Sequence, residues 1–201
     1  MAISNYAELQ TAVGAWMNRA DLASRIPEFI ANAEAEFNRT LRLPDMIRIQ
    51  TAFFATSRYT PLPADFLQME RLVLLSGASR DPLRYIGGDA DAEIEDGAPG
   101  MPRAYSIRGA SLELLPVPTQ SEQLEVSYWA RIPSLSTVAT NFLLSASPDL
   151  YLYRSCLEGA LYMQDEKRTV YFQGLYDRVL QQVQESGKAK RYGPAMRVQV
   201  V

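Results

Sequence analysis

The spacing of apolar residues changes twice along this chain, and no other feature constrains its fold as strongly. Apolar residues recur with a helical period in residues 5–43, with a strand period in much of residues 46–133, and with a helical period again in residues 147–187. The two periods bury different faces of the backbone, so each segment favours one element type. Runs of one type, rather than alternation, predict an α+β protein. We expect a helical bundle from the N- and C-terminal helices, an inserted antiparallel β-rich region, and an extended C-terminal tail.

Two helices are predicted before residue 46. Ser4 or Asn5 suits the N-cap of the first, and Pro27 suits the first turn of the second. The second helix carries an apolar stripe made of Ile26, Phe29, Ile30, Ala33, Phe37 and Leu41. The short connection predicts that the two helices pack antiparallel. Because residues two apart do not share a helix face, we expect Glu34 and Glu36 to be exposed charges rather than a catalytic pair.

Two further helices are predicted after residue 146. Ser147 and Pro148 have the residue types of an N-cap and a first helical position. The apolar stripes of these helices are Leu150, Tyr153, Leu157 and Leu161 in the first, and Phe172, Leu175, Tyr176, Val179 and Val183 in the second. Gly187 suits the position just after a helix, so we expect the last helix to end there.

Short strands are predicted between residues 46 and 133, where Pro and Gly interrupt every segment. Arg108-Gly109 is expected in a hairpin turn. Residues 65–75 fit either a helical turn or a strand, and residues 122–133 show a strand alternation. The predicted domains are residues 1–45 as the N-terminal helical pair of the bundle, 46–146 as the β-rich insertion, 147–191 as the C-terminal helical pair of the bundle, and 192–201 as an extended tail that docks on a partner.

The last residues have their own strand pattern beyond Gly193-Pro194. Met196, Val198 and Val200 alternate with Arg197 and Gln199. A strand that cannot complete its own sheet can add to the edge of another chain's sheet. We therefore predict that the apolar side of this segment enters a groove or sheet edge of another chain. A disordered or intramolecularly paired tail is the alternative.

Histidine is absent from the 201 residues, and cysteine occurs once, at Cys156. The commonest general base and the commonest metal ligand are therefore missing. We expect Cys156 to be a buried structural thiol in a reducing compartment. The net charge of −3 gives no reason to expect tight nucleic-acid binding. The sequence thus assigns no catalytic, cofactor-binding or metal-binding residue, and no cofactor.

The most acidic stretch, residues 87–100, fits a calcium loop poorly. Asp89, Asp91 and Glu93 have the spacing of the first ligands, but Ile94 stands where a turn glycine is needed and Gly100 where a glutamate is needed. We expect a solvated acidic turn or short helix. No signal peptide and no membrane contact are expected either, because the apolar runs are too short to span a bilayer.

Aromatic residues crowd the last two predicted helices. Tyr151, Tyr162 and Tyr171 do not all fit on the stripe that faces the bundle, and tyrosine is enriched in interface cores. We predict these three residues as candidates for an oligomer interface. The alternative is that they belong to the core and its amphipathic edges.

Several stretches, taken in order, resemble bacteriophage portal–tail adaptor proteins, which are also called head-to-tail connectors. In residues 6–42 the similar pieces are Asp21-Leu22, the stretch from Ile26 to Ile30, and the helix from Ala33-Glu34 to Arg39. Residues 100–118, 126–136 and 140–162 are also similar, and residues 139–153 carry the resemblance most strongly. The resemblance covers nearly the whole chain and rests on the ordered set rather than on one motif.

This resemblance implies a structural virion protein and not an enzyme. Such adaptors form a ring of about twelve copies beneath the portal at one capsid vertex. Tail nozzle or tail tube proteins attach below, and DNA passes through the lumen during genome ejection without specific binding. The resemblance implies assembly in the host cytoplasm and residence in the virion. It also implies the portal as the partner of the C-terminal tail, through Met196, Arg197, Val198, Gln199 and Val200.

Other functions stay open at this point. A tail-completion or neck protein would lie one layer further from the portal. A small-ligand binding module would need a large dry pocket. A hydrolase without histidine would need carboxylates or lysines brought together from distant segments, and Lys167, Lys188 and Lys190 all lie in polar segments.

Overall fold

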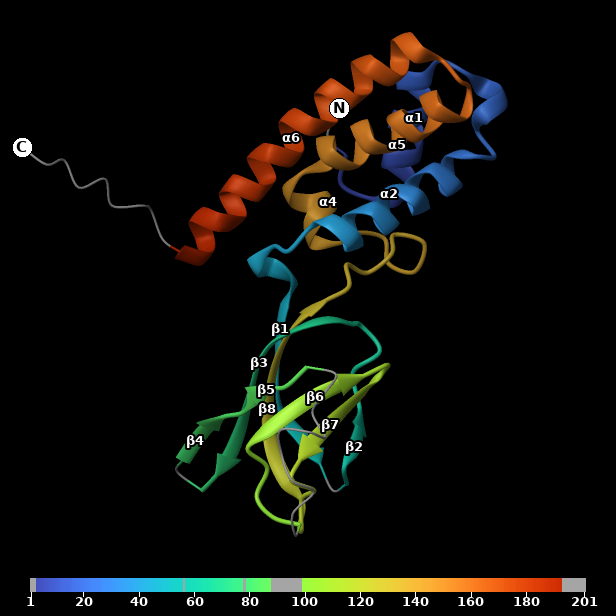
Figure 1. Cartoon of the computed structure of the whole chain (residues 1–201). Helices are drawn as coiled ribbons and strands as arrows, with labels where there is room; N and C mark the ends of the chain where they lie inside the picture. The colour runs from blue at the N-terminus through green and yellow to red at the C-terminus, as the bar shows by residue number, and fades with distance from the viewer. Residues whose placement is uncertain (1–2, 56, 78, 88–98, 193–201) are drawn as a thin grey trace, which may run out of the picture. The chain divides into compact units, whose positions relative to one another are not determined.

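The computed structural model describes residues 3–55, 57–77, 79–87 and 99–192 (Figure 1). The chain divides into two compact units, each with its own set of internal contacts. Residues up to 46 and from 132 onward form the first, which we call the helical unit. Residues 47–131 form the second, the β unit. Each unit is described by itself below.

The helical unit is organised around one central helix. Its described elements are α1 (Tyr6–Met17), η1 (Ala20–Leu22), α2 (Ile26–Thr40), η2 (Pro44–Met46), α4 (Phe142–Ala146), α5 (Pro148–Tyr162) and α6 (Glu166–Tyr192). The helices α1, α2, α4 and α6 all pack against α5 (Figure 1). As predicted, Asn5 caps α1, accepting a hydrogen bond from the Glu8 amide at 3.0 Å, and Pro27 lies in the first turn of α2.

The predicted core of the helical unit is confirmed at four of its residues. Phe29, Phe37, Leu157 and Val179 are all buried. Cys156 is buried too, as expected for a structural thiol. Leu161 is an exception, because it lies in the last turn of α5 and half of its surface is exposed. The stripe predicted for α5 is therefore wrong at this position.

The predicted end of the last helix at Gly187 is also wrong, because α6 continues to Tyr192. Gly187 allows α6 to pack closely and does not end the helix. A Cβ at Gly187 would lie 2.9 Å from Leu43 Cδ2 and 3.5 Å from Pro44 Cδ. Its absence lets α6 approach η2, where Lys190 Nζ also donates to Asp45 Oδ2 at 2.9 Å.

The β unit consists of two four-stranded sheets that share one core. The first has the order β1-β8-β3-β4 and the second β2-β7-β6-β5. The strands are β1 (Ile47–Ala55), β2 (Tyr59–Pro61), β3 (Phe66–Ser76), β4 (Ser79–Pro82), β5 (Arg84–Tyr85), β6 (Ala104–Arg108), β7 (Ser111–Leu115) and β8 (Glu122–Ala130). The β6–β7 hairpin turns at Gly109, which has a φ of 61°, and β3 settles the open assignment of residues 65–75 as strand.

The predicted arrangement, a helical bundle with an inserted antiparallel region and an extended tail, is corrected by these observations. The strands form two sheets, and the second is mixed because β5 pairs with β6 in parallel. The helices α1, α2, α4 and α6 all contact α5, so α5 lies at the centre of the unit. The α+β class itself agrees with the structure. The tail predicted at 192–201 lies, beyond Tyr192, outside the described residues.

β8 is buried on both faces, although its sequence alternates. Leu124, Val126 and Tyr128 join the core between the sheets. On the opposite face, Glu125 is buried because the guanidinium groups of Arg71 and Arg80 reach its carboxylate. The central position of β8 between β1 and β3 explains why polar residues of this strand are covered.

Candidate interaction surfaces

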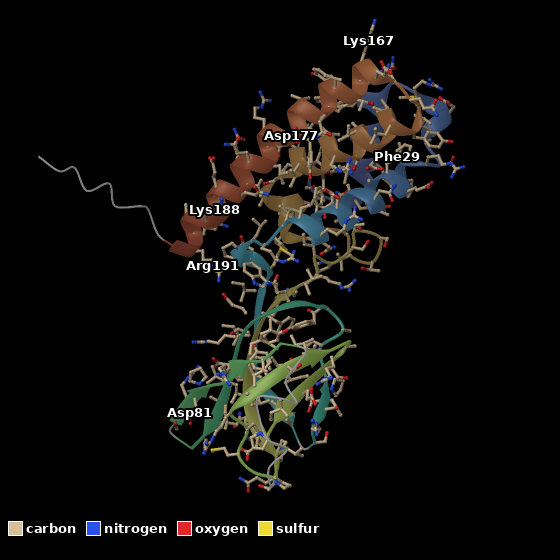
Figure 2. The ribbon with its side chains drawn as sticks, in the orientation of Figure 1. Phe29, Asp81, Lys167, Asp177, Lys188 and Arg191 are labelled. Atoms are coloured by element: carbon tan, nitrogen blue, oxygen red, sulfur yellow. The ribbon has the colours of Figure 1, made fainter. Side chains whose placement is uncertain are left out.

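Exposed apolar side chains gather where α5 turns into α6. We call this set the aromatic end; it consists of Trp16, Leu161, Tyr162, Val170 and Tyr171, each between 44% and 74% exposed. An isolated exposed apolar residue needs no explanation, but a contiguous group marks an interaction site. In Figure 2, Lys167 labels the start of α6, and Lys188 and Arg191 label the other end of the helix.

Ring contacts hold the aromatic end in place across four helices. The Trp16 ring lies 5.5 Å from that of Tyr153, and the Tyr171 ring lies 5.4 Å from that of Phe172. Tyr162 packs on Phe29 of α2 at 5.7 Å. These contacts restrict side-chain freedom before any partner arrives, which lowers the entropy cost of binding.

A charged contact fixes α6 against the end of α1 at the same place. Arg168 Nη1 donates to the Met17 carbonyl at 2.8 Å, and Arg168 Nε lies 3.3 Å from Asp165 Oδ2. A hollow of about 380 Å³ lies beside this contact. Its lining residues are Trp16, Lys167, Arg168, Tyr171 and Phe172. The aromatic end therefore combines a hollow with rigid ring edges.

A second hollow lies in the β unit, and we call it the β groove. It has a volume of about 520 Å³ and is lined by Phe66, Leu67, Gln68, Met69, Tyr85, Tyr105 and Ile107. These residues come from β3, β5 and β6, so the groove lies between the two sheets. Most of the lining is apolar or aromatic, and Tyr85 is 57% exposed. Among the described residues, the groove thus presents a partly exposed apolar surface beside strand backbones.

The structure separates the three tyrosines predicted at an oligomer interface. Tyr151 is fully buried; its ring packs edge-on against Phe37 at 4.9 Å, and its hydroxyl accepts a hydrogen bond from Asn141 Nδ2 at 2.8 Å. In this conformation Tyr151 belongs to the core, and burial raises the pKa of its hydroxyl. Tyr162 and Tyr171 are 56% and 59% exposed and lie in the aromatic end. Their role at an interface stays a prediction.

Sequence reasoning missed Trp16, Leu161 and Val170 as surface residues. Val170 precedes the Phe172–Val183 stripe of α6 and falls outside it. This position could have predicted the exposure of Val170 from the sequence. The spacing of Trp16 and Leu161 fits an apolar helical stripe. Their exposure is visible only in the structure, where they lie in the last turns of α1 and α5. The predicted docking residues 196–200 and most of the acidic stretch 87–100 lie outside the described residues.

Glu34 was also assigned wrongly from the sequence. It is buried, and its carboxylate accepts hydrogen bonds from the Leu135 amide at 2.7 Å and from Ser134 Oγ at 2.6 Å. The residue thereby holds the loop between residues 131 and 141 against α2. This is a structural role, since the carboxylate is fully engaged within the chain.

No metal-binding cluster of three His, Cys, Asp or Glu side chains occurs in the part of the chain that the structure describes. Burial raises the pKa of the Cys156 thiol to about 12, which keeps it protonated at neutral pH. Among the described helices, none has the length and apolar character that crossing a membrane requires.

Two comparisons with known proteins bear on the identity of the chain. The search of curated proteins found no match. The family model described as SU10 adaptor protein matches residues 4–199, which is nearly the whole chain. A match of this extent includes both units and all the described strands and helices. The chain therefore belongs to the SU10 adaptor protein family and is a structural phage protein of the virion that acts in head–tail joining.

Proposed function

We propose that the protein forms an adaptor ring of about twelve copies beneath the portal. The ring joins the portal to tail nozzle or tail tube proteins and lets DNA pass through its lumen without specific binding. It acts as a building block without catalysis or cofactor, and it assembles in the host cytoplasm. The family match over residues 4–199 carries this proposal.

The aromatic end supports self-association as the way the ring is built. A ring of identical subunits needs a heterologous interface, in which one surface of each copy meets a different surface of the next. Tyrosine and tryptophan are enriched at the centres of such interfaces. Tyr162 and Tyr171, with Trp16 beside them, supply such side chains on a rigid support. We assign them to the contact between neighbouring copies.

Sedimentation measurements test whether the ring forms. They compare the protein alone with a mixture of the protein and its portal. We expect a heavier species with many adaptor copies in the mixture, and micrographs should show it as a ring. If the mixture contains no species heavier than the portal, the proposal fails. Assembly on an isolated tail protein but not on the portal would favour the neck-protein alternative.

A matched pair of valine variants tests the interface. Val170→Asp places a charge in the aromatic end, where Val170 is 74% exposed, and should weaken assembly at least tenfold, because an interface charge without a partner costs about 2 kcal/mol or more. Val138→Asp changes an exposed valine elsewhere in the same unit and should leave assembly unchanged. Equal assembly of both variants would remove the aromatic end from the interface.

The portal as partner of Met196, Val198 and Val200 stays a prediction from the sequence. Deleting residues 194–201 should leave the melting temperature nearly unchanged and weaken incorporation into the portal-bound ring. If the truncated chain assembles as tightly as the full chain, the segment has no docking role at all.

A further inference from the structure

The outward face of α6 carries a glycine that packing among the described residues does not explain. A Cβ at Gly174 would meet nothing within 4 Å there, although glycine lowers the stability of a helix interior relative to alanine. Gly174 lies one turn after Val170 and Tyr171, which are 74% and 59% exposed. A close approach by another molecule at this point would account for all three residues.

We propose that the outward face of α6 packs on the outward face of α2 in the neighbouring copy, with Gly174 at the point of closest approach. This inference rests on the proposed ring and names the two different surfaces that meet at each contact between copies. Val170 and Tyr171 of the aromatic end then lie against α2 of the next copy. Residues 196–200 keep the portal as their predicted partner.

The outward face of α6 is defined by helical spacing. Phe172, Tyr176 and Val179 are buried against the rest of the helical unit. Gly174 lies on the opposite side of the helix, where it leaves a flat point between larger side chains. A second helix packs at an axial distance of about 8–10 Å, and the short end of that range needs small residues at the contact. The exposed residues of this face are Lys167, Val170, Gly174, Asp177, Arg178 and Gln181.

The outward face of α2 has a shape that fits such a contact. The buried face of α2 includes Phe29, Ala33 and Phe37. On the opposite, exposed face, Ala31 and Ala35 stand between two charged residues, so the middle of the face is flat. The full set of exposed residues on this face is Glu28, Ala31, Asn32, Ala35 and Arg39.

The charges at the beginning of the two faces match when the helices run in the same direction. Seven residues separate Lys167 from Gly174, and seven separate Glu28 from Ala35; each distance is about 10.5 Å of helix. When Gly174 lies on Ala35, the Lys167 ammonium therefore lies opposite the Glu28 carboxylate. Glu28 already pairs with Arg25, but that pair is exposed, so a second cation has access to the carboxylate.

The turn that follows the contact point carries one charge of each sign on both helices. Asp177 and Arg178 follow Gly174 on α6, and Glu36 and Arg39 follow Ala35 on α2. This turn therefore adds no net repulsion to the contact. The match between Lys167 and Glu28 thus sets the direction in which the helices run.

The positions of α2 and α6 suit a ring. Both helices pack on α5, which lies between them in Figure 1. A contact between two different faces on either side of a subunit is heterologous and repeats from copy to copy, as ring closure requires. Tyr162 packs on Phe29 at 5.7 Å, so its exposed ring borders the α2 side of the contact.

The remaining outer helix, α1, does not offer the second face. The Trp16 ring lies 6.4 Å from that of Phe172, and Arg168 donates to the Met17 carbonyl. These contacts place α1 beside α6 within one copy. The exposed face of α1 therefore provides matched control positions, such as Ala7.

Cross-linking between two kinds of full-length chain tests the contact. Protein with Val170→Cys is mixed with protein with Ala31→Cys, assembled on the portal, and treated with a short bifunctional maleimide at pH 7. Val170 and Ala31 each precede the contact residues by one turn, so they face each other in the proposed alignment. The matched control replaces Ala31→Cys by Ala7→Cys. Native Cys156 does not react, since burial raises its pKa to about 12.

We expect a covalent dimer that contains one chain of each kind, and no dimer from the control or from either variant alone. A dimer from one variant alone would mean that like faces meet, and no dimer in assembled rings would remove α2 from the interface. Either result overturns the inference while leaving the ring intact. If the unmodified protein forms no ring on the portal, the proposed function fails and this inference fails with it.

Charge reversal tests the alignment of the two helices. Lys167→Glu should weaken ring assembly about tenfold, because like charges then meet at every contact. Adding Glu28→Lys to the same chain should restore most of the assembly. Lys188→Glu with Glu28→Lys is the control and should show no recovery over Glu28→Lys alone, since Lys188 lies at the other end of α6 (Figure 2). A double variant of Lys167 and Glu28 without recovery would overturn the alignment.

A pair of leucine variants tests the close approach at the glycine. Gly174→Leu should weaken assembly about tenfold or more, because its side chain would occupy the space taken by α2 of the next copy. The melting temperature of the unassembled chain should not fall, since leucine is the better helix former. Ala7→Leu adds a side chain to the exposed face of α1 and should leave assembly unchanged. Equal assembly of the two variants would remove Gly174 from the interface and overturn the inference.

Discussion

Glu34 shows how one side chain fixes a loop that has no regular structure. Its carboxylate accepts hydrogen bonds from the Leu135 amide and the Ser134 hydroxyl, and the residue is only 7% exposed. Asn38, one turn later in α2, accepts a hydrogen bond from the Ile132 amide at 2.8 Å. The loop that begins at Ile132 in the helical unit is therefore held in place by polar side chains of α2.

Replacing Glu34 by alanine should lower the free energy of unfolding by about 1–3 kcal/mol, because the buried Leu135 amide loses its acceptor. Glu36→Ala is the matched control on the same helix. Among the described residues, the Glu36 carboxylate pairs with Arg39, whose side chain is 70% exposed, so its loss should change stability by about 0.5 kcal/mol or less. Urea unfolding of the two variants measures the difference, and equal effects would contradict the role assigned to Glu34.

Glu113 in β7 is the most buried carboxylate among the described residues of the β unit. It is 0% exposed and accepts hydrogen bonds from Arg58 and Arg108. Burial by itself raises the pKa of Glu113, but hydrogen bonds from Arg58, Arg108 and Tyr59 outweigh it, so the pKa lies below its usual value of 4.5. The ionised form is therefore the one that stabilises the fold.

This shift predicts a pH dependence with a defined sign. The stabilisation is present above pH 4.5, the pKa expected for the unfolded chain, and is lost as the pH falls through the lower folded pKa. Glu113→Gln should be less stable by about 1–3 kcal/mol at pH 7. The difference should narrow as the pH falls below 4.5. Unfolding curves at pH 7 and under acid conditions test this, and a constant difference would refute it.

At the scale of elements, three helical glycines differ in what an added Cβ would contact. A Cβ at Gly159 would lie 2.8 Å from Met17 Cε, and one at Gly187 would lie 2.9 Å from Leu43 Cδ2. Both glycines therefore allow close packing, of α5 on α1 and of α6 on η2. A Cβ at Gly174 would meet nothing within 4 Å. Packing within the described residues gives no reason for this glycine.

Gly174→Ala should raise the free energy of unfolding by about 0.5–1 kcal/mol, because alanine has the better helix propensity. Gly187→Ala gains the same propensity but forces Leu43 to move, so it should be less stable than Gly174→Ala by about 1 kcal/mol or more. Thermal melts of the two variants provide the measurement. Equal gains would show that α6 does not pack closely on η2.

At the scale of the whole molecule, the chain has two units with separate cores. The core of the β unit draws on residues from β1 to β8 and includes none from the helices. Phe29, by contrast, packs within the helical unit against Tyr162 and beside Gly159. Each unit therefore buries its own set of apolar side chains.

Phe29→Ala should cost about 3–5 kcal/mol, because Phe29 is only 3% exposed and its removal leaves a cavity. The loss should be local to the helical unit. Hydrogen exchange should quicken in α2 and α5, while amides of β3 and β8 keep their protection. Equal loss of protection in both units would mean that they unfold as one.

The sequence by itself determined the local elements and the class of the protein. Caps and turns, such as Asn5, Pro27 and Gly109, act on neighbouring backbone, so their effect is visible from a few residues. The ordered resemblance to phage adaptors likewise needed no structure, and the family match agrees with it. The apolar stripes also named Phe29, Phe37, Leu157 and Val179 as core residues correctly.

Only the tertiary structure decided which surfaces are covered. Tyr151 and Tyr162 are both tyrosines of α5, yet one is buried and the other exposed, because α5 is surrounded along most of its length but not at its end. Glu34 and Gly187 depend in the same way on contacts with distant residues. The pairing of β5 with β6 in parallel and the β groove beside it also arise from contacts that no local pattern encodes. Burial depends on how the whole chain folds. The spacing of apolar residues therefore predicts which face of a helix or strand is apolar, but not which element packs against that face.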